Sequence, residues 1–351
     1  MTSAESRQSS TAAPVLPPAL APGDVVAIVA PASDAAGRYP ERLERGLQAL
    51  RDAGLRPRLA TNARATGRWT AGTVDERVAD LHEAFKDDEV RAVLCAIGGS
   101  LSARLLPELD YGLIAAHPKV FCGYSDITTL HTAIRAETGL VTFYGPSVMA
   151  EWAEYPAPLR ETAEHFLKVT GSPQPAGPVP RPERIVTEGA DWGAPGQARR
   201  AEPVPTPEVL RPGRVEGTLA GGCLPVLRRL IGTPWQPDFT DCVVLLETPQ
   251  LPYSMVNAAE DLLSMNLAGM FEGARGIVFG WPFREDQIED LGHAITDSLY
   301  GHDFPVVIGF PCGHTSPMTT LPLGVRATLD GATLSLDGAA VAPRSSDGAG
   351  W

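Results

Sequence analysis

Apolar runs of strand length alternate with amphipathic helical patterns from residue 24 to residue 137. The strands are expected at 24–30, 90–97 and 119–122, and the helices at 42–53, around 78–85 and at 127–137. The helical segments show apolar side chains at the 3.6-residue period, whereas the strands are short continuous apolar runs. This alternation predicts parallel βαβ units, in which ligands usually bind at the carboxyl ends of the strands.

The alternation stops at residues 172–213, which contain 10 prolines in 42 residues. Proline fixes φ and lacks an N–H donor, so this stretch cannot be a regular helix or a central strand. Regular patterns resume at residue 214. The expected strands there are 241–247, 276–279 and 306–310, the helices are 257–267 and 288–299, and a closing hairpin joins 325–329 to 333–336.

These patterns predict an α/β protein with two domains, in line with about 100–200 residues per domain for a chain of 351 residues. We expect an N-terminal Rossmann-like parallel-sheet domain and a smaller C-terminal α/β domain with mixed strands, joined by a Pro-rich crossover. The expected segments are a disordered arm at 1–22, the first domain at 23–171, the crossover and substrate loop at 172–213, the second domain at 214–343 and a tail at 344–351.

Charge and cysteine content narrow the function classes. The chain has 29 Lys+Arg against 42 Asp+Glu, a net charge of −13, which argues against a nucleic-acid polymer as partner. Its five cysteines include no CxxC pair and its seven histidines no HExxH motif, so neither a disulfide framework nor a metal site is expected. Buried cysteines in a reducing compartment, no signal peptide and no membrane span together predict a cytoplasmic protein.

Ser125 is the first candidate for chemistry. It lies in Gly-Tyr-Ser-Asp at 123–126, between an apolar strand and a helix, as the nucleophile of a strand–turn–helix elbow does. Gly98 and Gly99 occupy a similar turn, where backbone N–H groups could bind an oxyanion or a phosphate. The structural alternatives are a helix N-cap at Ser125 or Asp126 and an ordinary strand–helix turn at the glycines.

Glu247 and His314 could complete a catalytic set. Glu247 ends a buried apolar strand, where a carboxylate needs a partner, and His314 follows another strand after a glycine. A serine, a histidine and a carboxylate are the nucleophile, base and orienting group of a hydrolase triad. Asp126 is an alternative orienting group and His131 an alternative base. Glu247 and His314 could instead each be an ordinary loop residue.

Seven segments in this order resemble the LD-carboxypeptidase family of serine peptidases, over about residues 23–340. They are Ile-Gly-Gly at 97–99, 105–111, Gly-Tyr-Ser-Asp at 123–126, Thr-Phe-Tyr-Gly-Pro at 142–146, 217–222, Leu-Leu-Glu at 245–247 and Gly-His-Thr at 313–315. The resemblance implies that Ser125 is the nucleophile, His314 the general base and Glu247 its orienting group. It also implies an oxyanion hole from the N–H groups of Gly99 and Asp126, a cleft between the domains, no cofactor and a homodimer.

The resemblance leaves two substrate classes. The long segment between residues 147 and 213 resembles that of the branch that cleaves aminoacyl- or peptidyl-nucleotide antibiotics, as in microcin C immunity. In that branch an aromatic residue of the inserted loop stacks on the nucleotide base, and Trp192 is the matching residue here. The other branch releases terminal D-alanine from murein tetrapeptides. Gly98, Trp192, Cys223 and Leu251 are the implied substrate-binding positions. Cys223 stands where many relatives have Asn, and 248–251 lacks the Lys of the microcin branch, so an apolar acyl group is a further expectation. A non-catalytic small-ligand-binding protein on the same scaffold is the third possibility.

Overall fold

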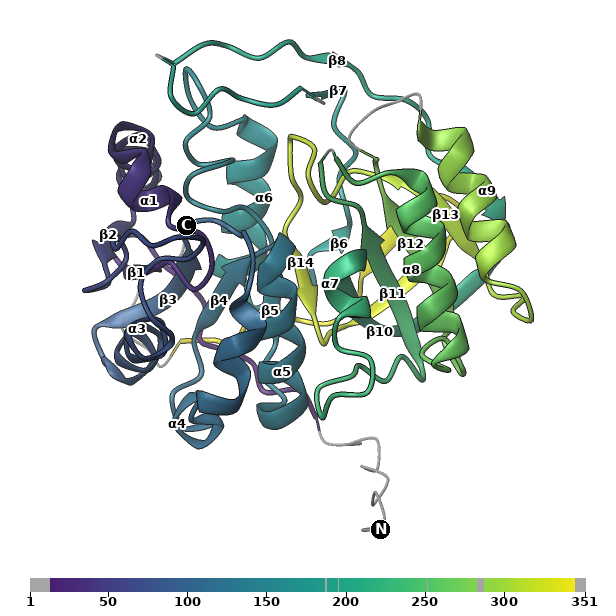
Figure 1. Ribbon diagram of the computed structural model, residues 1–351, viewed down its shortest axis with the longest axis horizontal. Coiled ribbons are helices and arrows are strands. Elements are labelled where there is room, and N and C mark those ends of the chain that lie inside the picture. The colour runs from purple at the N-terminus through teal and green to yellow at the C-terminus, as the bar shows by residue number, and fades with distance from the viewer. Residues whose placement is uncertain (1–12, 187, 195, 251, 283–286, 345–351) are drawn as a thin grey trace.

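The computed structural model describes residues 13–186, 188–194, 196–250, 252–282 and 287–344. Two sheets lie side by side, each with helices packed on it (Figure 1). The first has the order β14-β5-β4-β3-β1-β2, in which β1 to β5 are parallel and β14 is antiparallel at the edge. Its strands are β1 (Val25–Val29), β2 (Arg56–Leu59), β3 (Val90–Cys95), β4 (Val120–Gly123), β5 (Thr142–Tyr144) and β14 (Leu321–Leu323).

The helices of the first half connect these parallel strands, except for α6, which follows β5 and leads into the crossover. They are α1 (Ala35–Arg38), α2 (Pro40–Asp52), α3 (Val74–Lys86), the 3-10 helix η1 (Ser102–Glu108), α4 (Tyr111–Ala116), the 3-10 turn η2 (Ser125–Ile127), α5 (Thr128–Thr138) and α6 (Arg160–Gly171). Local signals fix several ends: Pro40 begins α2, Thr73 and Glu76 form a capping box on α3, and Gly139 ends α5 with φ +70°. The segment after Ser100 forms a 3-10 helix, and Pro107 removes a donor within it.

The second sheet has the order β6-β16-β15-β10-β11-β12-β13-β9. Its centre, β10 to β13, is parallel, and the strands outside it pair antiparallel, as a mixed sheet requires. The strands are β6 (Gly177–Pro178), β9 (Glu208–Arg211), β10 (Arg214–Cys223), β11 (Cys242–Glu247), β12 (Gly276–Gly280), β13 (Val306–Phe310), β15 (Arg326–Asp330) and β16 (Thr333–Leu336), with helices α7 (Leu224–Arg228), α8 (Met255–Leu267) and α9 (Ile288–Ser298). The predicted fold class, a parallel sheet joined to a mixed α/β unit, is confirmed.

Strand exchange between the segments differs from the expected organisation. β14 belongs to 214–343 by sequence, yet it pairs with β5 of the first sheet. The crossover supplies β6 and β9 to the second sheet, and β7 (Arg184–Ile185) pairs with β8 (Glu202–Pro203) beside it. The sequence patterns do not reveal this, because each of these strands is only two to four residues long.

The prediction of a disordered arm at 1–22 is wrong for the part that the structure describes. Val15 bridges to Leu140 and Pro18 bridges to Ala342, so residues 13–22 are held on the rest of the fold. Leu20 is buried in the main hydrophobic cluster. The Ser/Ala/Pro composition suggested a loose segment, but the apolar members of this stretch bury enough surface to hold it in place.

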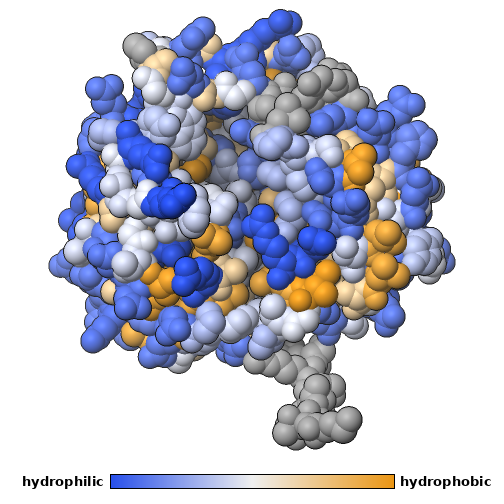
Figure 2. All heavy atoms as spheres, in the orientation of Figure 1, coloured by the Kyte–Doolittle hydropathy of each residue, from blue (hydrophilic) through white to orange (hydrophobic). Residues whose placement is uncertain are grey.

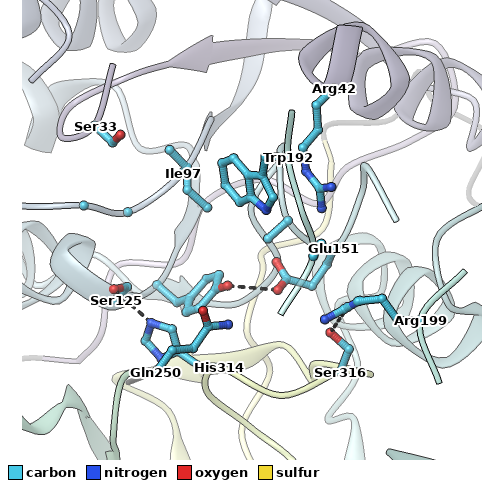
Figure 3. A pocket seen from close by; sticks show the side chains of 15 residues that line it. Ser33, Arg42, Ile97, Ser125, Glu151, Trp192, Arg199, Gln250, His314 and Ser316 are labelled. Carbon is cyan, nitrogen blue, oxygen red and sulfur yellow. Dashed lines mark hydrogen bonds between the residues drawn. The ribbon is translucent and has the colours of Figure 1, made fainter. Parts of the chain in front are cut away.

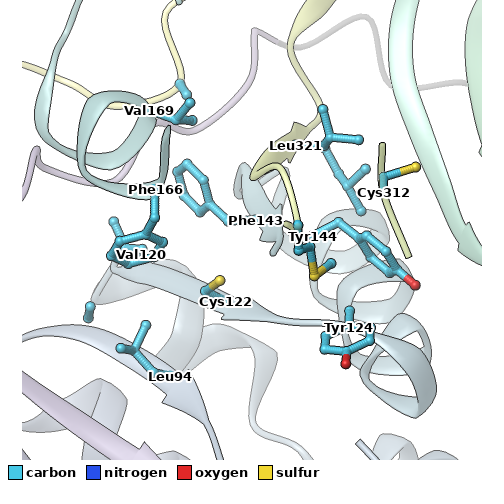
Figure 4. Packing of buried hydrophobic residues seen from close by; sticks show 14 of the residues in the cluster. Leu94, Val120, Cys122, Tyr124, Phe143, Tyr144, Phe166, Val169, Cys312 and Leu321 are labelled. Atoms are coloured by element: carbon cyan, nitrogen blue, oxygen red, sulfur yellow. The ribbon is translucent and has the colours of Figure 1, made fainter. Parts of the chain in front are cut away.

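The core between the first sheet and α6 supports the site region. Phe166 of α6, Phe143 of β5 and Leu321 of β14 belong to one buried cluster (Figure 4). All five cysteines are buried and free, as expected from their apolar surroundings. The face seen in Figure 2 is mainly hydrophilic, with apolar side chains gathered in the region of α8. Among the described residues, no helix is long and apolar enough to cross a membrane.

Candidate active site

Ser125 lies at a sharp turn between β4 and α5. Its φ is +63°, a left-handed conformation that costs energy for any residue other than glycine and is typical of strained functional turns. Gly98 allows this turn, because a Cβ there would lie 2.7 Å from the Cβ of Ser125. The serine side chain caps neither η2 nor α5, so the N-cap interpretation of Ser125 is wrong.

The structure brings Ser125, His314 and Glu247 together, although they are far apart in the sequence. His314 Nε2 lies 3.1 Å from Ser125 Oγ, and His314 Nδ1 lies 2.7 Å from Glu247 Oε2 (Figure 3 shows the first pair). A carboxylate only accepts hydrogen bonds, so Nδ1 donates its proton to Glu247. Nε2 is then free to accept the serine hydroxyl proton, as a general base must.

Glu247 is completely buried at the end of β11. Burial alone would raise its pKa, but the charge of His314 and hydrogen bonds from His314, Tyr144 and Cys223 outweigh burial, and the pKa is lowered. Burial alone would lower the pKa of His314, but the charge and hydrogen bond of Glu247 raise it above its ordinary value. The carboxylate therefore stays ionised and stabilises the imidazolium.

Glycines make room for this buried carboxylate. Gly313 has φ +94°, and a Cβ there would lie 2.6 Å from Glu247 Oε2. Gly280 of β12 flanks the other side, where a Cβ would lie 3.0 Å from the Cβ of Glu247. Gly313 precedes His314, so this close approach also sets where the imidazole meets the carboxylate.

The candidate oxyanion donors lie beside Ser125. Gly99 has φ +139° and packs closely on Ser33. A Cβ added at residue 99 would lie 2.7 Å from the Cβ of Ser33. Among the described residues, the N–H groups of Gly99 and Asp126 donate to no other group of the chain. N–H groups that are free next to a serine hydroxyl could stabilise a negative charge that develops there.

The alternative acid–base residues have other partners. The Asp126 carboxylate accepts a hydrogen bond from Ser102 N at 2.8 Å and pairs with Arg229 at 3.4 Å. His131 Nε2 bonds the Gly123 carbonyl at 2.9 Å, and burial lowers the pKa of this histidine to about 4. In the part of the chain that the structure describes, no hydrogen bond joins either side chain to His314 or to Ser125 Oγ, so the geometry does not favour these alternatives.

A cavity of about 270 Å³ opens in front of Ser125. Gly98, Gly99 and His314 line it near the serine, and Trp192 lines it further away (Figure 3). The lining also includes Ser33, Arg42, Ile97, Tyr124, Ala150, Glu151, Ala190, Arg199, Gln250 and Ser316. The Pro-rich crossover thus reaches the site through Trp192 and Arg199.

Trp192 is half-buried and held by two neighbours. The Arg42 guanidinium lies 4.7 Å from the indole centroid, and Tyr39 meets the ring edge to face with centroids 5.8 Å apart. Burial, together with the nearby charges of Arg45 and Arg199 and against those of Glu154 and Glu151, lowers the pKa of Arg42 to about 10. Arg42 therefore stays cationic at neutral pH, and the cavity has an aromatic ring with a positive charge beside it.

One implied substrate position does not line this cavity, and another lies outside the described residues. Cys223 ends β10 in register with Glu247 and is buried behind it, and it is not among the lining residues. Its substrate-binding role is therefore not supported, because its neighbour is the carboxylate. Leu251 lies outside the described residues, whereas Gln250 before it lines the cavity.

Sequence reasoning gave no role to two tyrosines that lie next to the catalytic candidates. The Tyr144 hydroxyl lies 2.6 Å from Glu247 Oε1, and the Ser125 N–H lies 3.3 Å from the same hydroxyl. The Tyr124 hydroxyl donates to Glu151 at 3.0 Å, and its ring packs against His314. Both tyrosines stand in the segments 123–126 and 142–146 that carry the family resemblance, which is the signal that could have singled them out.

Comparisons with known proteins agree with this architecture. Residues 26–145 match the model of the LD-carboxypeptidase N-terminal domain, and residues 216–329 match that of the C-terminal domain. The chain is 34% identical over 321 residues to the probable murein peptide carboxypeptidase of Bacillus subtilis (strain 168), covering 90% of this chain and 91% of the relative. The chain belongs to the LD-carboxypeptidase family.

Other members of the LD-carboxypeptidase family extend the comparison. The microcin C7 self-immunity protein MccF of Escherichia coli is 30% identical over 341 residues, covering 90% of this chain and 93% of the relative. A solved structure of MccF in complex with glutamyl sulfamoyl guanosine matches with a TM-score of 0.88 at 28% identity, covering 94% of this chain and all of that chain. Membership supports a carboxypeptidase or related hydrolase activity.

Within the described ranges, no group of three or more His, Cys, Asp or Glu could hold a metal ion.

Proposed function

We propose that the protein is a serine hydrolase that cleaves the amide-type bond of aminoacyl- or peptidyl-nucleotide conjugates. The observation that carries the proposal is the hydrogen-bonded series from Ser125 Oγ through His314 to Glu247, at 3.1 and 2.7 Å, in a cavity that Trp192 also lines. The series supplies a nucleophile and a base, and the indole supplies a stacking surface.

The proposed reaction has two steps. Ser125 Oγ attacks the carbonyl carbon while its proton moves to His314 Nε2, and the N–H groups of Gly99 and Asp126 stabilise the oxyanion. The C–N bond then breaks, and the leaving nitrogen takes the proton from His314. Water attacks the resulting ester with His314 as base, which releases the acid and restores Ser125. Glu247 stabilises the imidazolium in both steps.

The nucleotide part of the proposal rests on the Trp192 ring and on the positive charge of Arg42 beside it. Stacking of a base on an aromatic side chain is worth about 1–3 kcal/mol, and the cation of Arg42 lies where a phosphate or sulfamoyl group could approach. A relative of known structure binds glutamyl sulfamoyl guanosine. We therefore assign the leaving group to the Trp192 end of the cavity.

The second candidate is a murein tetrapeptide carboxypeptidase that releases terminal D-alanine with the same three residues. Arg42 and Arg199 favour it, because two guanidinium groups lining the cavity could bind the terminal carboxylate of a peptide. The 34% identity to a probable murein peptide carboxypeptidase is consistent with this reading. A small-ligand-binding protein without activity is the third candidate.

Product analysis by mass spectrometry separates the three. A panel of aminoacyl sulfamoyl adenosines and murein tetrapeptides is incubated with the protein, with Ser125→Ala and with Trp192→Ala. We expect hydrolysis of the nucleotide conjugates, a loss of at least about 10⁴-fold in Ser125→Ala, and a loss of about 10-fold in Trp192→Ala. Tyr300→Ala, an exposed aromatic away from the cavity, is the matched control.

Other outcomes identify the alternatives. Release of D-alanine with little effect of Trp192→Ala would support the murein activity. No product from either class, together with no adduct on Ser125 from a serine-directed phosphonate, would support a binding protein. The homodimer and the cytoplasmic location stay predictions, and light scattering of the purified protein would test the first.

A further inference from the structure

A second cavity opens beside the candidate active site. It has a volume of about 560 Å³ and is lined by Ser33, Trp69, Gly99, Ser100 and Leu101. It shares the lining residues Ser33 and Gly99 with the cavity of Ser125, so the two cavities adjoin at the candidate oxyanion donor. In Figure 3, Ser33 lies on the side of Ile97 away from Trp192, and the second cavity therefore leads away from the stacking tryptophan.

Two large apolar side chains face solvent at this cavity. Trp69 is 65% exposed and Leu101 is 39% exposed. Eight large apolar side chains of the described residues are exposed, and two of these eight line one cavity that adjoins the nucleophile. Exposed apolar side chains that gather at a concave site usually mark a binding surface.

The loop that carries Trp69 is braced at both ends. Gly67 N donates to Asp34 Oδ2 at 3.2 Å, and the Gly67 carbonyl accepts from Arg38 at 3.1 Å. At the other end, Ala71 N donates to the Ala32 carbonyl at 3.0 Å, next to Ser33. The Arg68 guanidinium also lies 5.0 Å from the indole centroid. The exposed ring is thus held in place before any ligand arrives, which lowers the entropy cost of binding.

Leu101 is tied to the elbow of the candidate nucleophile. It has φ +68°, an unfavourable conformation for leucine. The following residue, Ser102, donates its N–H to the Asp126 carboxylate at 2.8 Å and its hydroxyl to the Asp126 carbonyl at 2.7 Å. The side chain of Leu101 is therefore positioned by the same residue whose N–H is a candidate oxyanion donor.

We propose that Trp69 and Leu101 form a subsite for an apolar group on the acyl side of the scissile bond. The inference rests on the proposed function, which directs the leaving group to Trp192 and the carbonyl to Ser125. The acyl part then continues past Gly99 into the second cavity. The residues that line that cavity are uncharged, and its two large side chains are apolar, so it suits an apolar side chain.

The test compares three substrates that differ only in the acyl group: alanyl, phenylalanyl and aspartyl sulfamoyl adenosine. The measured quantity is the ratio of kcat/KM for phenylalanyl to that for alanyl. We expect this ratio to exceed that of aspartyl to alanyl, to fall about 10-fold in Trp69→Ala and to fall about 3-fold in Leu101→Gly. Glycine accepts the positive φ of residue 101, so this variant removes the side chain without new strain. Tyr300→Ala should leave the ratio unchanged.

A binding measurement separates this inference from the proposed function. Calorimetry measures the dissociation constants of the same three compounds on Ser125→Ala protein, with and without the further change Trp69→Ala. The ratio of these constants for the phenylalanyl and alanyl compounds then reports on binding alone. Tighter phenylalanyl binding that depends on Trp69, with no hydrolysis by the unmodified enzyme, would keep the subsite and reject the proposed reaction. Hydrolysis with a ratio that does not change in Trp69→Ala, or a preference for aspartyl, would overturn the subsite.

Discussion

The Tyr144 hydroxyl lies 2.6 Å from Glu247 Oε1 and connects the two sheets at the candidate active site. Tyr144 ends β5 of the first sheet, whereas Glu247 ends β11 of the second. The same hydroxyl accepts the Ser125 N–H at 3.3 Å. One phenol therefore holds the carboxylate and the backbone of the candidate nucleophile in a fixed relation.

Replacing Tyr144 by Phe removes this hydroxyl and keeps the buried ring. We expect kcat/KM to fall about 10-fold, because about 1.4 kcal/mol of orientation and charge stabilisation is lost. The carboxylate loses a donor and attracts the imidazolium more strongly, so the inflection of the pH–rate profile should move to higher pH. A pH profile of kcat/KM for the variant measures both effects.

Tyr253→Phe is the matched control, since its hydroxyl also donates to a carboxylate, that of Asp261, at 2.7 Å. It should lose similar stability without a shift of the pH–rate inflection. If Tyr144→Phe changed stability alone and left the inflection where it is, Tyr144 would be only a packing residue.

The sequence predicted the catalytic candidates better than the organisation around them. Glu247 ends a buried strand and His314 follows another strand of the same sheet, and strand ends gather at one edge of an α/β sheet, so the meeting of these two residues could be expected. Ser125 comes from the other sheet, and only the family resemblance predicted that it would join them. The pairing of β14 with β5 could not be expected, because a three-residue strand has no measurable period and its partner lies far away in the chain. The role of Tyr144 was hidden for a similar reason, since a tyrosine at a strand end is most often a core residue and its acceptor comes from the other sheet.

The pH dependence of activity should follow His314. Its pKa is raised above 6.5, chiefly because the Glu247 carboxylate outweighs burial. The base must be neutral, so kcat/KM should rise with pH and reach half of its plateau above pH 6.5. Stopped assays across pH 5–10 at constant ionic strength would show this, and a half-maximum below pH 6 would contradict the arrangement.

Stability should change in the opposite direction over the same range. A raised folded pKa means that the contribution of His314 to the free energy of unfolding is complete below pH 6.5 and is lost as the pH rises through the folded value. For Glu247 the folded pKa is lowered, so its contribution is present above about pH 4.5 and lost as the pH falls below it. Denaturant unfolding at several pH values should give a smaller free energy at pH 9 than at pH 6, and His314→Gln should remove much of that difference.

Thiol reagents should leave the folded protein intact. Burial raises the pKa of the thiol of Cys242 to about 11, and it raises those of Cys95, Cys122, Cys223 and Cys312 as well. Thiolates are therefore scarce at pH 8, and the sulfur atoms are hidden from reagent. We expect mass spectrometry to find no adduct after iodoacetamide treatment of the native protein and five adducts after unfolding. Rapid inactivation with one adduct would show that a cysteine reaches the cavity after all.

Gly313→Ala should disable the site through the carboxylate. Its Cβ would lie 2.6 Å from Glu247 Oε2 at φ +94°, so the chain must move Glu247, His314 or both. We expect kcat/KM to fall about 100-fold and the free energy of unfolding to fall by about 2–4 kcal/mol, the sum of the left-handed strain and the overpacking. Gly301→Ala shares a positive φ of +84° but meets nothing within 4 Å, so it should cost only about 1 kcal/mol and leave kcat/KM unchanged. Equal activity in the two variants would mean that the close approach of Gly313 to Glu247 does not position the imidazole.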